Sequence, residues 1–162
     1  MPVDTAGSTI VPSLLDRLTA PEEGPVARSW GAALAQLKAS LRRDLESLLN
    51  TRRRPGALGG DLPELARSSV RYGIPDFIAI NMAAHERQAA FGRALERVIR
   101  DYEPRLANVA VSLLAPPHGQ DRILCFRIEA MLRIEPTPEP IIFESVLDPI
   151  SRTFSVKGDI DG

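Results

Sequence analysis

Leucines recur at intervals of three and four residues from Ser29 onward, which is the spacing of one face of an α-helix. Charged side chains fill many of the positions between them. The leucines of this face are Leu34, Leu37, Leu41, Leu45, Leu48 and Leu49. The pattern predicts an amphipathic helix that runs to Asn50, because Pro55 and the glycine-rich segment 56–60 that follow disfavour a helix.

A short helix and a second long helix are expected next. Asp61 and Glu64 are spaced like an N-terminal capping pair and predict a short helix over 62–70. Apolar residues at helical spacing return near Asn81 and continue to Tyr102, which predicts the second long helix. Its apolar positions include Phe91, Leu95, Val98 and Ile99.

The segment SVRYGIPDF, residues 69–77, separates these two helices. Gly73 can adopt backbone conformations that other residues avoid. Pro75 disfavours helical geometry at the residue before it. We therefore expect a turn of defined shape in this segment rather than a continuous helix.

After Pro104 the hydrophobic period changes from about 3.6 residues to 2, which is the period of a β-strand. Strands are expected over 108–114 and 124–134, and shorter ones over 141–146 and 153–156. Their short connections imply antiparallel pairing, with one face of the sheet against the helices. We expect an α+β fold, with two long amphipathic helices and a short one packed on a C-terminal antiparallel sheet of about four strands.

The first 28 residues differ in composition from the rest of the chain. They are rich in Pro, Gly, Ser and Thr around one apolar island, Ile10 to Leu18. This composition predicts a flexible N-terminal arm over 1–28 that carries a short docking element. The remaining residues, 29–162, are expected to form a single α+β domain.

Composition and charge narrow the classes of function. The 20 Lys and Arg residues nearly balance the 21 Asp and Glu residues, for a formal net charge of -1. This balance gives no general reason to expect nucleic acid or an anionic membrane as a partner. No apolar run approaches the roughly 18 residues of a membrane span, and the first residues lack a signal-peptide pattern. The single cysteine, Cys125, suits a reducing compartment, so a cytoplasmic protein without membrane insertion is expected.

Few residues are candidates for catalysis. Glu103, Glu129 and Glu144 are carboxyl groups that could be nominated for glycoside hydrolysis, which needs two such groups across a sugar bond. Glu129 is expected on the solvated face of its strand. Arg105 stands two residues from Glu103 and is an unfavourable neighbour for a general acid at neutral pH. We expect neither catalysis nor a small-molecule substrate.

Metal and phosphate sites are also weakly supported. His85 and His118 lie far apart and have no spacing typical of metal ligands. Arg52, Arg53 and Arg54 follow the first long helix, where cations stabilise the helix dipole. These arginines could also bind phosphate, but no aromatic residues are interleaved with them as in nucleic-acid-binding segments. We expect no metal, no cofactor and no nucleic-acid partner.

Glu103, Pro104 and Arg105 lie where the second long helix meets the first strand. Pro104 ends the helix, so the two charged side chains are expected to project from a stiff corner. In one interpretation they pair with neighbours and fix the junction. In the other, the corner binds another protein. The residues alone leave both interpretations open.

Several stretches in this order resemble the TssE family, the small baseplate wedge subunits of bacterial type VI secretion systems. The stretches are SLLDRL (13–18), LLNTRRR (48–54), SVRYGIPDF (69–77), YEPRL (102–106) and IIFESVLD (141–148). The family is related to the lysozyme-like wedge protein of contractile phage tails. The resemblance implies a structural protein, with a peptidoglycan-cleaving, lysozyme-like hydrolase as the alternative.

The resemblance also implies roles for particular residues. It assigns docking on the core bundle of the larger wedge subunits to Glu103, Pro104 and Arg105. It makes 29–162 a wedge and sheath-initiator domain, from which the contractile sheath grows by strand exchange with sheath subunits. An exposed sheet edge at 141–146 or 153–156 is expected to take part.

Further candidate partner contacts are Arg52, Arg53, Arg54, Ile141 and Phe143. A charge reversal at the corner, Arg105→Glu, is expected to abolish assembly. The isolated fold is expected to stay nearly unchanged, because an exposed charge adds little stability.

Overall fold

The computed structural model describes residues 18, 30–53, 63–66, 68–76, 85–115, 123–148 and 150–158. Apart from Leu18, the expected N-terminal arm 1–28 lies outside the described residues. The same holds for the candidate contact Arg54, for His118 and for the capping residue Asp61.

Two helices follow the predicted apolar periods. Helix α2 spans Trp30–Asn50 and helix α4 spans His85–Tyr102. Their buried faces carry the leucines and the aromatic and β-branched residues of the two sequence patterns. The short helix predicted over 62–70 is instead divided into a four-residue helix, α3 (Pro63–Ala66), and the 3₁₀ turn η1 (Ser69–Arg71).

Four strands form one antiparallel sheet in the order β1-β2-β3-β4. They are β1 (Leu106–Leu114), β2 (Leu124–Leu132), β3 (Glu139–Asp148) and β4 (Thr153–Lys157). Each strand pairs with the strand that follows it in the chain. The predicted α+β class, with two helices and an antiparallel sheet of four strands, is therefore confirmed.

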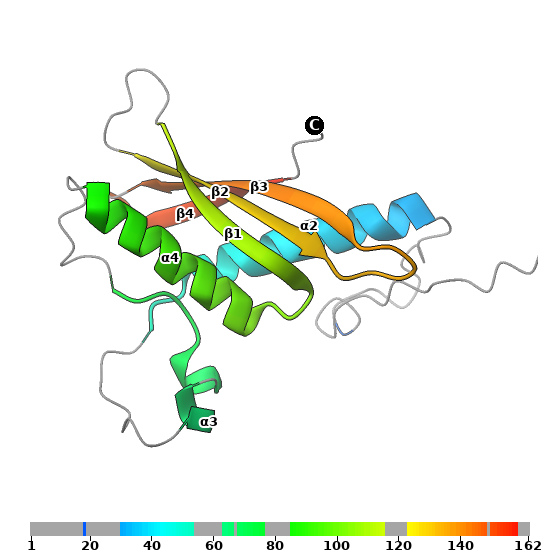
Figure 1. Cartoon of the computed structure of the whole chain (residues 1–162), viewed down its shortest axis with the longest axis horizontal. Helices are drawn as coiled ribbons and strands as arrows, with labels where there is room; N and C mark the ends of the chain where they lie inside the picture. The colour runs from blue at the N-terminus through cyan, green and yellow to red at the C-terminus, as the bar shows by residue number, and fades with distance from the viewer. Residues whose placement is uncertain are drawn as a thin grey trace, which may run out of the picture.

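Both helices cover the same side of the sheet (Figure 1). Helix α4 packs along β1 and helix α2 packs against β4. Alternate strand residues point into the single core between sheet and helices; in β2 these are Phe126, Ile128, Ala130 and Leu132. Glu129 lies on the opposite, outer face and is exposed, as the period of two predicts.

The expectation of an exposed edge at 141–146 is wrong, because β3 is paired with β2 on one side and β4 on the other. Ile141 and Phe143 are each 1% exposed and belong to the core. Their alternation shows which face of the strand is buried, but it does not show the position of the strand in the sheet. The edges of the sheet are β1 and β4.

The turn predicted around Gly73 is confirmed, and it is built against the end of α2. The Arg53 amide donates to the Ile74 carbonyl at 2.8 Å, and the Ile74 amide donates to the Thr51 carbonyl at 2.9 Å. Gly73 has φ +106°, and a Cβ atom there would lie 2.4 Å from the Thr51 carbonyl oxygen. Glycine is therefore required at this position by both the dihedral angle and the close approach of the backbones.

Candidate functional site

The corner between α4 and β1 is a tight turn. The Glu103 amide closes the last turn of α4 on the Ile99 carbonyl at 2.8 Å. The Leu106 amide then donates to the Glu103 carbonyl at 3.1 Å, which starts β1 directly after the turn. Pro104 lies between them and is exposed.

Arg105 is held between two carboxylates from different elements. Its Nε and Nη2 atoms donate to Oε1 and Oε2 of Glu103, each at 2.6 Å. Nη2 also donates to Oδ2 of Asp44 in α2 at 2.6 Å. The bidentate pair with Glu103 fixes the shape of the corner, and the bond to Asp44 ties the corner to α2.

Because the network is partly buried, its loss is expected to cost more stability than the loss of a surface ion pair. Glu103 is 6% exposed and is the only charged residue among the described ones that is fully buried. The side chains of Arg105 and Asp44 are 26% and 30% exposed. Hydrogen bonding to Glu103 raises the pKa of Arg105 above its usual value, with Asp44 adding to the effect and burial opposing it. The guanidinium therefore holds its charge more firmly than a free arginine does.

The structure shows Glu103 and Arg105 paired with neighbours, as the first interpretation of the corner required. This pairing leaves the docking interpretation untested, because Pro104 and part of Arg105 remain accessible. Asp44 is the member of the corner that sequence reasoning missed. It stands among the charged positions of an amphipathic helix, and nothing in that pattern distinguishes it from a solvated carboxylate.

The aromatic residues beside the corner connect it to η1. The rings of Tyr72 and Tyr102 meet edge to face with their centres 5.3 Å apart. The Tyr102 hydroxyl donates to the Ser68 carbonyl at 3.1 Å. Burial raises the pKa of Tyr72, and the charges of Asp44 and Glu103 add to this shift. The tyrosines therefore join the corner, α2 and η1 in one packed unit.

We expect Tyr102→Phe to lower the free energy of unfolding by about 1 kcal/mol. The substitution keeps the ring contact with Tyr72 but removes one of two hydrogen bonds to the Ser68 carbonyl, which also accepts from the Arg71 amide at 3.0 Å. Urea denaturation followed by circular dichroism measures the change. Stability equal to that of the wild type would show that this hydrogen bond contributes nothing measurable.

Two of the three arginines after α2 are within the described residues, and both lie beyond its last turn, which contains no basic residue. Arg52 Nη2 donates to the Arg152 carbonyl at 2.6 Å, and Arg53 Nε donates to the Arg71 carbonyl at 3.2 Å. Their described bonds thus join the end of α2 to the β3–β4 turn and to η1. This differs from the predicted role on the helix dipole.

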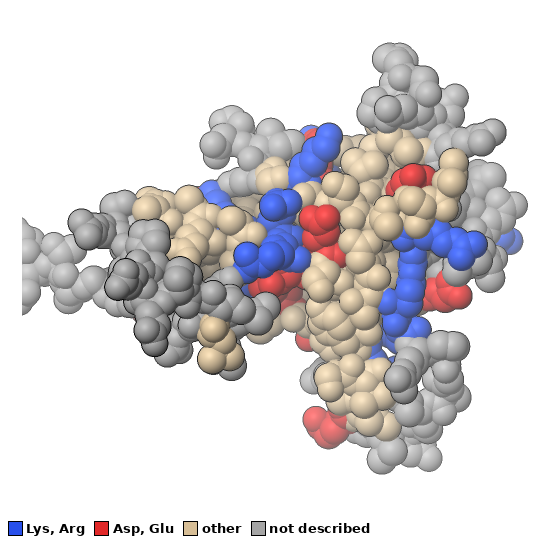
Figure 2. Space-filling view, turned by 180° about the vertical axis from the view of Figure 1, so that it is seen from behind, with Lys and Arg blue, Asp and Glu red and all other residues tan. Residues whose placement is uncertain are grey.

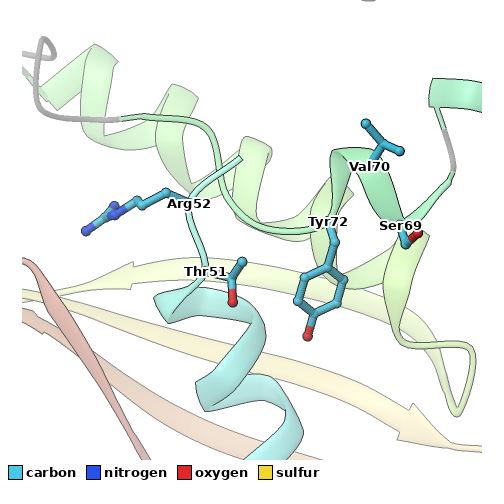
Figure 3. Close-up of a pocket in the computed structure, with 5 residues that line it drawn as sticks. All are labelled: Thr51, Arg52, Ser69, Val70 and Tyr72. Atoms are coloured by element: carbon cyan, nitrogen blue, oxygen red, sulfur yellow. The ribbon is translucent and has the colours of Figure 1, made fainter. Parts of the chain in front are cut away.

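A hollow of about 350 Å³ lies between the end of α2 and η1 (Figure 3). It is lined by Thr51, Arg52, Ser69, Val70 and Tyr72. Figure 3 shows the Arg52 side chain pointing away from the Tyr72 ring, which turns toward α2. None of these five described residues is a carboxylate, so they do not supply the pair of acids that glycoside hydrolysis requires.

The candidate acids of a hydrolase lie elsewhere. The β2–β3 register places Glu129 and Glu144 on the outer face of the sheet as diagonal neighbours. Glu144 is 3.5 Å from Arg127, which lies directly opposite on β2. Both acids stand on the outer face of the sheet and do not line the hollow, and Glu103 is bound by Arg105 at the corner. The geometry gives no support to an acid pair enclosed around a substrate.

Charges of both signs are interspersed on the side of the molecule seen in Figure 2, where basic and acidic side chains lie next to each other. Described ion pairs between opposite charges include Lys38 with Glu139 at 2.7 Å and Arg42 with Glu46 at 3.5 Å. The mixed charge agrees with a formal net charge of -1.

Within the described ranges, no group of three or more His, Cys, Asp and Glu side chains is placed to hold a metal ion. None of the helices described is both long enough and apolar enough to cross a membrane. Cys125 is a buried free thiol in β2, and burial raises its pKa.

The family comparison agrees with the sequence resemblance. No curated protein matches the chain. A solved structure described as "The baseplate complex from the type VI secretion system" contains a similar chain, at 19% identity and a TM-score of 0.48. The similarity covers 69% of this chain and 94% of the chain in the solved structure. The family model for baseplate wedge protein gp25 matches residues 35–137, which is more than half of the 162 residues and includes most of α2, the corner and β2. The chain therefore belongs to the gp25 family of baseplate wedge proteins.

Proposed function

We propose that this chain is a structural baseplate component of a bacterial type VI secretion machine. In this role it docks on the larger wedge subunits and initiates polymerisation of the contractile sheath, without enzymatic activity. Membership in the baseplate wedge family supports the baseplate role. The observation that carries the docking role is the corner, where ion pairs hold an exposed proline in a fixed position.

The three corner residues are proposed to have different roles in docking. Glu103 is almost fully buried and bonds Arg105 through both carboxylate oxygens, so it positions the arginine. Pro104 and the accessible part of Arg105 form the surface that meets the partner. Because the corner is already ordered, little conformational entropy is lost when the partner binds.

The charges of the corner limit the kind of contact it makes. One guanidinium is shared by two carboxylates, so the group is net negative and Arg105 is not free to pair with an acidic partner. The corner is therefore proposed to act through its shape and through hydrogen bonds from the accessible part of Arg105. An acidic segment of the partner would be repelled by Asp44.

The docking role is tested by a pull-down from the native cell with Pro104→Lys. This change places a bulky cation at the exposed apex while leaving the ion pairs in place, so the stability is expected to change by less than about 1 kcal/mol. We expect recovery of the larger wedge subunits to fall at least tenfold. Pro138→Lys, at another exposed proline in the β2–β3 connection, is the matched control and is expected to behave as the wild type.

Three results would decide against parts of this proposal. Equal recovery with Pro104→Lys and Pro138→Lys would place docking away from the corner. A wild-type chain that captures no baseplate subunit would remove the adaptor function. Clearing of peptidoglycan by the purified chain would favour the hydrolase alternative. Arg105→Glu is unsuitable for this test, because it would bring three carboxylates together and disturb the fold as well as docking.

The proposed initiation of the sheath takes place by strand exchange at an edge of the sheet. Edge strands present unpaired backbone groups, and the edges here are β1 and β4. Arg52, Arg53, Ile141 and Phe143 remain candidate contacts. Ile141 and Phe143 lie in the core of the isolated chain, so their side chains would reach a partner only if the sheet opened.

A further inference from the structure

The outer edge of β4 is occupied by a side chain of α2. The Phe154 amide donates to Asn50 Oδ1 at 2.8 Å, and Asn50 Nδ2 donates to the Phe154 carbonyl at 2.9 Å. The carboxamide of Asn50 thus takes the place of the two bonds that a residue of an adjacent antiparallel strand would make to Phe154. A new strand could not pair with Phe154 unless Asn50 moved away.

Two arginines extend this closure on either side of Phe154. Arg42 Nη1 donates to the Val156 carbonyl at 3.3 Å, and Arg52 Nη2 donates to the Arg152 carbonyl at 2.6 Å. Successive residues of an antiparallel strand alternate between facing the paired strand and facing away from it. The bonds therefore fall on three successive outward-facing residues, Arg152, Phe154 and Val156.

Side chains and helices of the described residues cover the outer edge of β1 over only part of its length. Arg100 Nη2 donates to the Val109 carbonyl at 3.2 Å, near the β-bulge. Helix α4 then passes close to Val111, since a Cβ atom on Gly92 would lie 3.9 Å from its carbonyl oxygen. By the same alternation, the next outward residue is Leu113. From Ser112 to Leu114, no side chain of the described part of the chain is bonded to this edge.

The two edges therefore differ in what they offer to an incoming strand. Helix α2 packs against β4, while in Figure 1 the C-terminal end of β1 diverges from α4. Backbone hydrogen bonds at an edge recognise any extended segment, so the accessible edge decides where such a segment binds. Closing an edge with side chains is a common way in which proteins prevent unwanted strand pairing.

We propose that the C-terminal half of β1 accepts an extended segment of a neighbouring sheath subunit, and that Asn50, Arg42 and Arg52 keep β4 closed to it. This inference rests on the proposed role in sheath initiation and assigns that role to one edge. The candidate edge at 153–156 is thereby excluded while Asn50 remains in place.

Two serines provide a matched test. Ser112 in β1 and Ser155 in β4 are both exposed and both lie on the outer face, at opposite edges of the sheet. Each is replaced by cysteine in a full-length Cys125→Ala background, and a short thiol-to-amine cross-linker is added to baseplate complexes purified with their sheath subunits. We expect cross-links to sheath subunits from Ser112→Cys to be at least tenfold more abundant than those from Ser155→Cys.

The closure of β4 has its own readout. Hydrogen exchange at the Phe154 amide is expected to be at least tenfold faster in Asn50→Ala than in the wild type, because Asn50 Oδ1 accepts from that amide. Ser155→Cys is expected to gain cross-links to the sheath when combined with Asn50→Ala. An unchanged hydrogen-exchange rate at the Phe154 amide in Asn50→Ala would contradict the proposal that Asn50 closes the β4 edge. This result would hold even if other variants proved unstable.

The outcomes separate this inference from the proposed function. Cross-links from Ser155→Cys that equal or exceed those from Ser112→Cys would overturn the choice of edge but retain strand exchange. Cross-links from neither position, in complexes that contain sheath subunits, would overturn strand exchange itself and this inference with it. Cross-links confined to Ser112→Cys would support both.

Discussion

Replacing Gly73 with alanine is expected to lower the free energy of unfolding by about 3 kcal/mol. The φ angle of +106° is unfavourable for any residue with a Cβ atom. The added atom would also lie 2.4 Å from the Thr51 carbonyl oxygen, which is backbone and cannot rotate away. The end of α2 and the turn would have to separate, with loss of the two hydrogen bonds that link Thr51 and Arg53 to Ile74.

Gly31→Ala is the control for this prediction. Gly31 is exposed near the start of α2, and a Cβ atom there would meet nothing within 4 Å. Alanine favours the helix, so this variant is expected to be as stable as the wild type or more stable by up to about 1 kcal/mol. Urea denaturation of the three proteins measures both differences. A Gly73→Ala variant within about 0.5 kcal/mol of the wild type would mean that the turn adapts at little cost.

Arg105→Ala is expected to destabilise the chain by about 3 kcal/mol, because it leaves the buried carboxylate of Glu103 without its counter-charge. The loss of the bond to Asp44 also separates the corner from α2. Arg97→Ala, at an exposed position of α4, is the control and is expected to change stability by less than about 0.5 kcal/mol. Thermal and urea unfolding of both variants compare them directly.

A double variant separates the two causes of this loss. Replacing Glu103 by glutamine together with Arg105→Ala removes the uncompensated charge, and is expected to recover part of the stability. Equal destabilisation in the single and double variants would show that the geometry of the corner matters more than its charge. A pH titration cannot replace these variants. The folded-state pKa of Arg105 is raised, so its contribution is complete below the unfolded-state pKa and is lost only above the folded one, outside the accessible range.

The sequence predicted the elements of the fold well because each leaves a periodic pattern. The three-to-four spacing of Leu37, Leu41, Leu45 and Leu48 marks the buried face of α2, and the period of two in β2 marks the buried face of the sheet. Gly73 and Pro104 act on the backbone near their own positions. Their effects could therefore be predicted without knowing the rest of the fold.

Contacts between distant segments could not be predicted in the same way. Asp44 and Asn50 belong to the polar positions of an amphipathic helix, yet one holds Arg105 and the other bonds both backbone groups of Phe154. Periodicity identifies the face on which a residue lies, but not the element that packs there. The same limit explains the wrong edge at 141–146, since a strand buried on one face has the same pattern at an edge or in the middle of a sheet.

The backbone bridge between Thr51–Arg53 and Ile74 also has a consequence for protein engineering. It fixes the two ends of the intervening segment next to each other, so an insertion between Arg53 and Pro63 need not change their separation. Doubling the length of a connecting loop costs only about 0.6 kcal/mol in closure entropy. An epitope or a fluorescent tag is therefore best inserted between Arg53 and Pro63, before the packed turn η1, and would locate single subunits in an assembled machine.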